Sequence, residues 1–456
     1  MKKISLTCVI LFVTGCAYQP KEYDLSVGMP AGLNQSEVQK QSISADQAIN
    51  TRWWQVFNSD QLNQLMQQLA HSNINLEVVR LRLEKSKALL AQQTAENWLN
   101  MNTSARASQG YNFDNNTGSN SSGLGFSAGY EVDLWGERDA ANASAELNVI
   151  ASEQQLASTL LQLQGELASQ YFNHLSLLQK LEIGRQNLEA SESLFRLIQA
   201  QFEAGSVSGI EVSQQRNSLL SARTQLMKVK RDLKISERAL ALLLGDANMK
   251  LDLATEDINQ LSLPVIAEAQ SAQQLIKRPD IQIAQTQLKI QDATLFQTET
   301  RKWPSLNISS GLNLADLLEL GSGWTGSLAA SLGMPLFDAG KIDSQIKAAE
   351  TDVDIALANY RDTVIAAIKE TLDTLTDLQY QDQLFMVRAE ELENNQQLYE
   401  LAKIRFDSGD TDFLNLLNAQ RSWFSAKLTY ATAKLDVIQA NVNVFKALAG
   451  APVLKG

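Results

Sequence analysis

The strongest constraint on the fold is an apolar pattern that occurs twice, about 204 residues apart. From Leu219 to Leu243, apolar or small residues recur at alternating steps of three and four, the a/d pattern of a helix that packs along another helix. The same steps recur from Trp423 to Ala447 with no insertion or deletion. The two sets are Leu219, Ala222, Leu226, Val229, Leu233, Ser236, Leu240 and Leu243, and Trp423, Ala426, Tyr430, Ala433, Val437, Ala440, Val444 and Ala447. The sequence therefore predicts an internal duplication.

A second helical pattern precedes each copy of the first. Its members recur every seven residues and are Leu160, Leu167, His174, Leu181, Leu188, Phe195 and Phe202, with counterparts Val364, Thr371, Leu378, Phe385, Leu392, Tyr399 and Phe406. Each half is expected to end in two long helices that fold back at Gly205 and at Gly409, because glycine commonly ends helices. A helix from Ala140 to Phe202 would be on the order of 90 Å long at about 1.5 Å per residue.

The composition disfavours several classes of function. The formal net charge of −12 disfavours a nucleic-acid partner, which requires a basic face to neutralise phosphates. Two histidines, His71 and His174, and two cysteines, Cys8 and Cys16, leave little material for a metal site or a nucleophilic triad. We expect both histidines to occupy ordinary helix positions and expect no catalytic group, metal or cofactor.

The N-terminus has the zones of a secretory signal. Lys2 and Lys3 precede an apolar run over 4–13, which is too short to span a bilayer permanently. A small residue followed by Cys16 resembles a bacterial lipobox, so Cys16 would become the lipidated first residue of the mature chain. Ala17 stands where an aspartate would favour inner-membrane retention, so the resemblance implies outer-membrane sorting. The alternative is an ordinary signal with an incidental cysteine.

Residues 18–44 contain two prolines and no periodicity, which predicts an extended segment over the surface. Helix is expected from Ala45 or Asp46. An apolar stripe then consists of Trp53, Trp54, Phe57, Leu62, Leu65 and Leu69, and a second helical pattern of Leu76, Val79, Leu83 and Leu90 continues to about Trp98.

The period then changes from 3.6 to 2. Apolar residues alternate with small or polar ones from Leu124 to Leu134, as in a strand with lipid on one side and a wet lumen on the other. A weaker strand over 101–113 is joined to it by a polar loop over 114–120. The second half repeats this, with strands over 306–314 and 328–336 and Gly321–Gly323 between them. The alternative is a solvent-exposed hairpin, which would leave an apolar patch and unpaired edges.

Four strands per chain are too few to close a membrane barrel, because known single-chain barrels begin at about eight strands. Two or more copies must share the barrel, and three copies would supply twelve strands. Between the halves, 245–269 is expected to be a linker. A further helix then begins near Pro279, with Asp280 at its N-terminus, and continues to Trp303.

Several motifs in this order make the chain resemble the TolC-like outer-membrane efflux channels, specifically the NodT-type lipoprotein subgroup that serves resistance-nodulation-division pumps. The motifs are Cys16, Trp53-Trp54, Phe57, Arg278-Pro279-Asp280-Ile281, Pro304-Ser305-Leu306, Pro335-Leu336-Phe337-Asp338-Ala339-Gly340, and Leu414-x-x-Leu417-x-Ala419-Gln420-Arg421-Ser422. The resemblance covers nearly the whole mature chain. It implies a mainly α fold with membrane β structure, namely a homotrimer with a transmembrane β-barrel and a periplasmic α-barrel of twelve helices. A periplasmic adaptor (membrane fusion) protein would dock at the turns near Gly205 and Gly409.

The resemblance also divides the chain. The expected segments are a signal peptide (1–15), a lipid-anchored extended segment (16–50), first-half helices (51–100), a membrane hairpin (101–135), a long helical hairpin (136–245), a linker (246–277), a second-half helix (278–303), a second membrane hairpin (304–337), a second helical hairpin (338–450) and a tail (451–456).

In this family the periplasmic tip closes like an iris. The matching positions here are Leu414, Asn415, Asn418 and Arg421, with Glu211 in the first turn. Relatives often carry aspartates where this chain has asparagines, and asparagine can only hydrogen-bond, so cation block at the aperture is not implied here. We hypothesise that Arg421 pairs with an acid near the first turn, such as Glu211, in the resting channel. The alternative is that Arg421 is a solvated surface charge.

Three functions fit these features. The first is a passive exit duct for drugs, other toxic small molecules or metal ions, with an adaptor and an inner-membrane resistance-nodulation-division pump as partners. The second is the outlet of a type I polypeptide secretion system, which the lipobox and the Arg278-Pro279-Asp280 motif disfavour. The third is a periplasmic coiled-coil scaffold, which the amphipathic hairpins disfavour. The sequence does not identify the transported substrate, because selectivity in such systems belongs to the pump.

Overall fold

The structure is a computed structural model. It describes residues 18–26, 33–34, 52–114, 116–246, 256–264, 266, 270–271, 275–315, 323–410 and 412–449. The signal peptide, Cys16, the expected helix start at Ala45 or Asp46, about half of the linker and the C-terminal tail lie outside the described residues.

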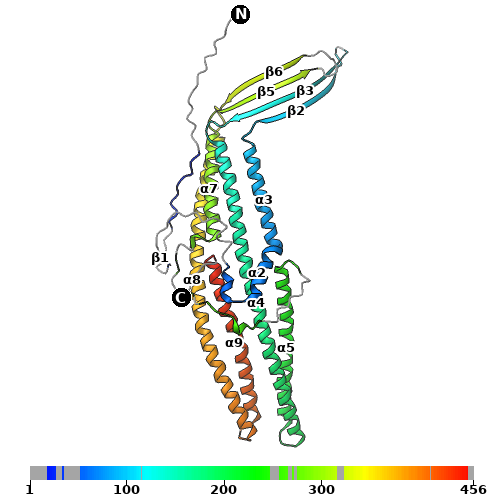
Figure 1. The fold of residues 1–456 in the computed structure, drawn as a ribbon, viewed down its shortest axis with the longest axis vertical. Helices are drawn as coiled ribbons and strands as arrows, with labels where there is room; N and C mark the ends of the chain where they lie inside the picture. Colours follow the sequence, from blue (N-terminus) through cyan, green and yellow to red (C-terminus); the bar gives the residue numbers. More distant parts are fainter. Residues whose placement is uncertain are drawn as a thin grey trace. The chain divides into compact units, whose positions relative to one another are not determined.

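The described elements are mostly helical (Figure 1). In chain order they are β1 (Leu33–Asn34), η1 (Trp53–Phe57), α2 (Asp60–Ser72), α3 (Ile74–Ala95), β2 (Asn100–Asn112), β3 (Thr117–Val132), α4 (Glu137–Glu203), α5 (Gly209–Leu243), η2 (Ile258–Gln260), β4 (Gln270–Ser271), α7 (Pro279–Thr300), β5 (Ser305–Ala315), β6 (Trp324–Gly333), α8 (Lys341–Asp407) and α9 (Phe413–Ala447).

The two halves repeat each other closely. Helices α4 and α8 each contain 67 residues, and α5 and α9 each contain 35. Hydrogen bonds repeat as well. The Asn73 side chain donates to the Leu243 carbonyl at 2.7 Å, and the Arg278 guanidinium donates to the corresponding carbonyl of Ala447 at 2.8 Å. The predicted duplication is confirmed down to single hydrogen bonds.

The expected helix seams are buried. In α5, the seam residues Ala222, Leu226, Val229, Ser236 and Leu240 are all buried, as the pattern of threes and fours predicts. The largest core cluster combines Trp53, Phe57, Leu62, Leu167, Tyr171, Phe172, Leu240, Ile438, Val442 and Phe445 with other apolar residues. Segments that are distant in the sequence therefore share one core.

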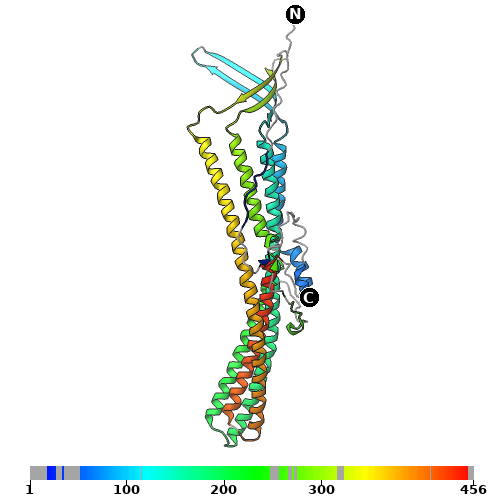
Figure 2. The same ribbon diagram turned by 90° about the vertical axis from the view of Figure 1, so that its left-hand side faces the viewer.

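The chain divides into two compact units, and the 67-residue helices α4 and α8 supply residues to both. The first unit comprises 1–26, 81–153 and 283–362 and contains the four-stranded sheet. Here α7 and α8 lie side by side (Figures 1 and 2), with Leu288 and Leu295 packed against Val353. The second unit comprises 27–80, 154–282 and 363–456 and contains the two helical turns.

The sheet is antiparallel in the order β2-β3-β5-β6. Both predicted hairpins are present, but two boundaries were wrong. Strand β3 begins at Thr117, within the expected polar loop, because main-chain pairing with β2 does not require apolar side chains. Strand β6 ends at Gly333, so Met334 and Leu336 lie beyond it, on either side of Pro335, which has no amide hydrogen to donate.

Candidate functional site

The four-stranded sheet has one apolar and one polar face. The register places Phe126 beside Leu312, and alternate positions on every strand share their face. The apolar face includes Met101, Thr103, Ala105, Leu124, Phe126, Ala128, Tyr130, Val132, Leu306, Ile308, Ser310, Leu312, Leu314, Trp324, Leu328, Ala330 and Leu332. The polar face includes Asn102, Ser104, Arg106, Ser108, Gly123, Gly125, Ser127, Gly129, Glu131, Asn307, Ser309, Gly311, Asn313, Thr325, Ser327 and Ser331. Such a sheet suits an interface between lipid and water.

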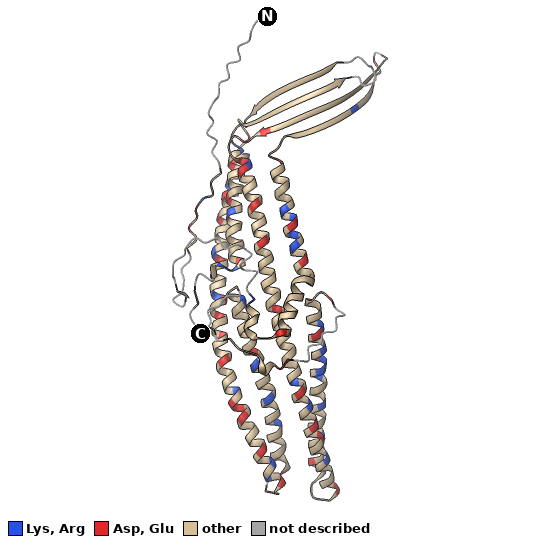
Figure 3. Cartoon of the chain, viewed as in Figure 1, with Lys and Arg blue, Asp and Glu red and all other residues tan. Residues whose placement is uncertain are grey.

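Charged residues are nearly absent from the strands. In Figure 3 the sheet is almost entirely free of Lys, Arg, Asp and Glu, and the strand sequences contain only Arg106 and Glu131. No helix in the described part of the chain has the length and apolar character of a membrane-spanning helix.

Aromatic residues gather where the strands meet the helices. The rings of Trp135 and Trp303 lie 4.9 Å apart, and the Trp135 indole donates to the Pro304 carbonyl at 2.7 Å. Trp98, between α3 and β2, and Phe337, between β6 and α8, are exposed. Tryptophan prefers the boundary between lipid and water, because its ring is apolar and its N–H is polar. These four aromatic residues therefore mark one edge of the apolar face.

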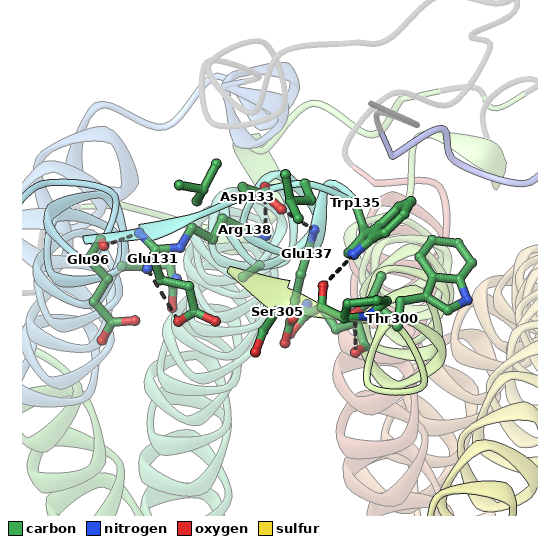
Figure 4. A pocket seen from close by; sticks show the side chains of 15 residues that line it. Glu96, Glu131, Asp133, Trp135, Glu137, Arg138, Thr300 and Ser305 are labelled. Atoms are coloured by element: carbon green, nitrogen blue, oxygen red, sulfur yellow. Dashed lines mark hydrogen bonds and ion pairs between the residues drawn. The ribbon is translucent and has the colours of Figure 1, made fainter. Parts of the chain in front are cut away.

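A cavity of about 290 Å³ lies at the same junction (Figure 4). Asp133 accepts from the amides of Gly136, Glu137, Arg138 and Asp139, which caps the start of α4. Arg138 donates to the Glu96 carbonyl and lies 3.6 Å from the Glu131 carboxylate. Burial, with the nearby carboxylates of Glu131 and Asp133, raises the pKa of Glu137. These contacts link the end of β3 to the start of α4.

The two helical turns have the same construction. Gly205 and Gly409 have φ angles of 74° and 77°, a left-handed conformation that favours glycine. The amide of Ser206 donates to the Gln201 carbonyl at 2.8 Å, and the amide of Asp410 donates to the Arg405 carbonyl at 2.9 Å. Both turns are therefore Schellman motifs, and both lie where the sequence predicted a chain reversal.

The helices that leave the turns are capped differently. Ser208 and Glu211 form a capping box at the start of α5, in which Glu211 accepts from the Ser208 amide at 2.9 Å. Asp412 caps α9 by accepting from the Asn415 amide at 3.0 Å. In the first of these caps, the hydrogen bonds that Glu211 accepts from Ser208 hold the pKa of the Glu211 carboxyl below its usual range.

A small apolar cluster joins the two turns. Ile198 from α4 packs with Phe413 and Leu417 from α9, and Val207 from the first turn and Phe406 from the end of α8 lie against them. The rings of Phe406 and Phe413 are 6.4 Å apart. The two turns therefore form one body within the second unit.

The four expected aperture residues in the second turn are exposed. Leu414, Asn418 and Arg421 follow steps of four and three, which places them on one side of α9. Asn415 lies next to this stripe and is also exposed. Phe413, Leu416, Leu417 and Gln420, which alternate with them, are buried. The helix thus anchors one face in the core and presents the aperture residues on another.

Within the described part of a single chain, no ion pair joins Arg421 to Glu211. The carboxylate of Glu211 instead accepts from the amide and hydroxyl of Ser208. A bond from Glu211 to Arg421 would therefore compete with the capping box.

The sequence did not reveal how the N-terminal segment is held. Asp292 on α7 is only 5% exposed, and its carboxylate accepts from the Tyr18 hydroxyl at 3.0 Å, the Lys21 amide at 3.1 Å and the Tyr23 hydroxyl at 2.6 Å. Burial and the Asp292 carboxylate raise the pKa of both tyrosines. Nothing in the sequence around Asp292 distinguishes it from a surface acid.

The described residues contain no grouping of three His, Cys, Asp or Glu side chains that could hold a metal ion. The Arg278 guanidinium is buried and lies 2.8 Å from Asp280 and 2.5 Å from Glu370. Since it also donates to the carbonyl at the end of α9, the Arg278-Pro279-Asp280 motif serves the packing of α7, α8 and α9.

The sequence matches the outer membrane efflux protein family over residues 65–246 and 271–450. It is 28% identical to the pyoverdine export outer membrane protein OpmQ of Pseudomonas aeruginosa, over 99% of this chain and 97% of that protein. It is 26% identical to the probable outer membrane lipoprotein SilC of Salmonella typhimurium, over 99% and 98%. The fold resembles that of the Campylobacter jejuni outer membrane channel CmeC, with a TM-score of 0.83 and 22% identity over 96% and 95%. Because the family match spans most of its length, the chain belongs to the outer membrane efflux protein family.

Proposed function

We propose that three copies of this chain form the outer-membrane exit duct of a tripartite efflux pump, through which small molecules pass passively from the periplasm to the exterior. The sheet carries this proposal. It has one apolar face, and its outer strands β2 and β6 each have one edge that pairs with no described strand. A sheet in lipid must close on itself, because the membrane cannot hydrogen-bond a free edge. Four strands from each of three copies would close a barrel of twelve.

The helical repeat supports the same assembly. Within one chain, α4 packs against α9 through buried Ile183, Phe424 and Ala431. The residues 204 positions away in the repeat are Val387, Leu220 and Met227, and these apolar side chains are 59%, 49% and 66% exposed. Because the same helices recur with the same spacing, α8 of one copy can pack against α5 of the next as α4 packs against α9. Each chain would then supply four helices to a continuous wall of twelve.

The exposed stripe on α9 supports a gate at the turns. We place the aperture at Leu414, Asn415, Asn418 and Arg421, with Glu211 in the first turn. The exposed side chains stand on a helix whose other face is fixed by the apolar cluster that joins the turns, so a movement of one turn would carry the other with it. The turns at Gly205 and Gly409 are the proposed docking site for a periplasmic adaptor.

The proposed partners follow from this arrangement. A duct of this kind needs no catalytic group, so the energy would come from an inner-membrane resistance-nodulation-division pump, with the adaptor between the two. OpmQ is named for pyoverdine export, which supports a small-molecule substrate over a polypeptide. The apolar face of the sheet argues against a periplasmic scaffold, which would expose that face to water.

We further propose that Cys16 carries a covalent lipid in the outer membrane and that the segment division expected from the sequence holds, from the signal peptide (1–15) to the tail (451–456). The hydrogen bonds that Asp292 accepts from Tyr18, Lys21 and Tyr23 form what we call the clamp at Asp292. It supports a lipid attachment point close to the body of the protein, because Tyr18, two residues after Cys16, is bound to α7. SilC, named as a probable outer membrane lipoprotein, is similar over nearly its whole length.

A deletion strain tests the proposed function. Loss of the gene should increase susceptibility to toxic small molecules, and plasmid-borne protein should restore resistance. The gate is tested separately by the conductance of purified trimers in planar bilayers, where Arg421→Ala should change how far the channel closes. A strain whose susceptibility is unchanged but which fails to secrete a polypeptide would support the secretion outlet instead. Unchanged closure in Arg421→Ala would remove that residue from the gate.

A further inference from the structure

Arg106 lies midway along β2, with six strand residues on either side. The register pairs it with Gly123 of β3, so no side chain stands directly opposite, and Ser104 and Ser108 are its neighbours on the same face. The residue is exposed. Its guanidinium therefore projects from the polar face among small, neutral residues.

No described residue neutralises this charge. Arg106 has neither an ion pair nor a hydrogen bond with any other residue in the described part of the chain, and Glu131 is the only acidic residue in the four strands. Glu131 lies eight residues along β3 from Gly123, or about 26 Å at 3.3 Å per residue, and it lies close to Arg138. Among the residues that the structure describes, the cation on β2 is thus uncompensated.

The position of this charge restricts where the polar face can point. A charged side chain at the middle of a membrane strand is costly on the lipid side and is tolerated toward a water-filled interior. The position of Arg106 and the alternation of apolar and polar residues along the strands both indicate that the polar face of the sheet is the one in contact with water. In an assembly of three copies, three guanidinium groups would stand around the interior at similar depth.

We propose that Arg106 forms an anion-attracting zone inside the barrel that favours the passage of small molecules bearing carboxylate, sulfonate or phosphate groups. This inference rests on the proposed duct. Rings of basic side chains favour anions in pores, and the planar guanidinium binds carboxylate and phosphate oxygens in pairs. The zone acts on molecules already delivered by a pump, so it eases or hinders their exit and does not select among them at entry.

A single cysteine can measure the local potential independently of the periplasmic gate. Ser104→Cys places a thiol on the polar face, about 7 Å from position 106. Its reaction rate with an anionic methanethiosulfonate (a sulfonate) is compared with that of a cationic one (a quaternary ammonium) on intact trimers in vesicles. With Arg106 present, the anionic reagent should be favoured, and Arg106→Gln should lower the anionic-to-cationic rate ratio about threefold in 0.1 M salt. Arg106→Lys should keep the ratio high.

Matched controls separate this inference from the duct itself. Ala105→Cys, on the apolar face, should react with neither reagent, and Lys87→Gln on α3 should leave the ratio at position 104 unchanged. An unchanged ratio in Arg106→Gln, or an equal fall in Lys87→Gln, would overturn the anion zone alone. A thiol at position 104 that is inaccessible to both reagents, or a reactive thiol at position 105, would overturn the assigned faces and the duct with them.

Discussion

The ammonium of Lys427 on α9 donates a hydrogen bond to the amide oxygen of Gln186 on α4 at 3.2 Å. It also lies 3.9 Å from the centroid of the Trp423 ring. Burial at this contact lowers the pKa of Lys427. In the other half of the repeat, Arg223 on α5 stands at the position of Lys427 and Glu390 on α8 at the position of Gln186. The corresponding pair is therefore ionic. It lies on the two exposed faces that we propose to meet between copies.

A charge exchange tests that pair. Arg223→Glu and Glu390→Arg should each lower the temperature at which detergent-solubilised trimers dissociate. The double variant should recover part of the loss, because Arg223 also lies 3.6 Å from Glu192 of its own chain and that pair stays broken. The coupling should be about 0.5–1 kcal/mol per interface, since the pair is partly solvated. Lys347→Glu, in a surface pair elsewhere on α8, is the control and should have little effect. Additive losses in the double variant would show that the two residues do not meet.

His174 predicts a dependence of stability on pH. Its ring is buried, its Nδ1 lies 2.9 Å from the Ser236 hydroxyl, and burial lowers its pKa to about 4. Below pH 6.5 the unfolded chain binds a proton that the native chain does not, so stability should be full above pH 6.5. It should fall by on the order of 3 kcal/mol as the pH drops to about 4.

The second half of the chain supplies the matched variant for this test. Leu378 and Ala440 occupy the positions of His174 and Ser236 there. His174→Leu combined with Ser236→Ala should therefore fold and flatten the pH dependence of the melting temperature between pH 6.5 and 4. An equally steep dependence in the double variant would show that another group causes it.

The ends of the two seam helices predict opposite effects of one methyl group. Gly245 has a φ of 81°, and a Cβ there would lie 2.2 Å from the Ser72 carbonyl oxygen, whereas its counterpart Ala449 has a φ of 51°. Gly245→Ala should lower the melting temperature markedly. Ala449→Gly should raise or preserve it, because glycine relieves a conformational cost of about 1 kcal/mol. Differential scanning calorimetry of the two variants measures both effects, and a stabilised Gly245→Ala would contradict the close contact.

The clamp at Asp292 predicts that one carboxylate secures the N-terminal segment. Asp292→Ala should release Tyr18 and Tyr23 and speed trypsin cleavage after Lys21 at least severalfold, because three hydrogen bonds and the packing of Tyr23 would be lost. Asp292→Asn keeps two lone pairs on one oxygen and should show an intermediate rate. Cleavage as slow as in the unaltered chain would mean that apolar packing alone holds the segment.

The sequence predicted the parts of the fold that depend on period. The seam from Leu219 to Leu243 and the turns at Gly205 and Gly409 were found because apolar spacing and glycine directly encode buried faces and chain reversals. The start of β3 at Thr117 was missed, because that pairing uses main-chain groups that any residue supplies. The acceptor role of Asp292 was missed for a related reason, since its donors lie more than 260 residues away in the sequence.

The proposed gate at the helical turns was also predicted only in part. The exposed positions at Leu414, Asn418 and Arg421 could be expected from the family resemblance and from helical spacing. The engagement of Glu211 by Ser208 was missed although the sequence carries a signal for it, because Ser208-x-x-Glu211 has the spacing of a capping box at the start of a helix. The proposed wall of twelve helices depends on faces that only a second copy can cover.

The molar mass of the mature, detergent-solubilised protein tests the shared barrel most directly. Light scattering corrected for bound detergent should give three chains per particle, and removal of detergent should precipitate the protein. A stable monomer in water without detergent would contradict the account, because its apolar sheet face would then need neither lipid nor a neighbouring copy.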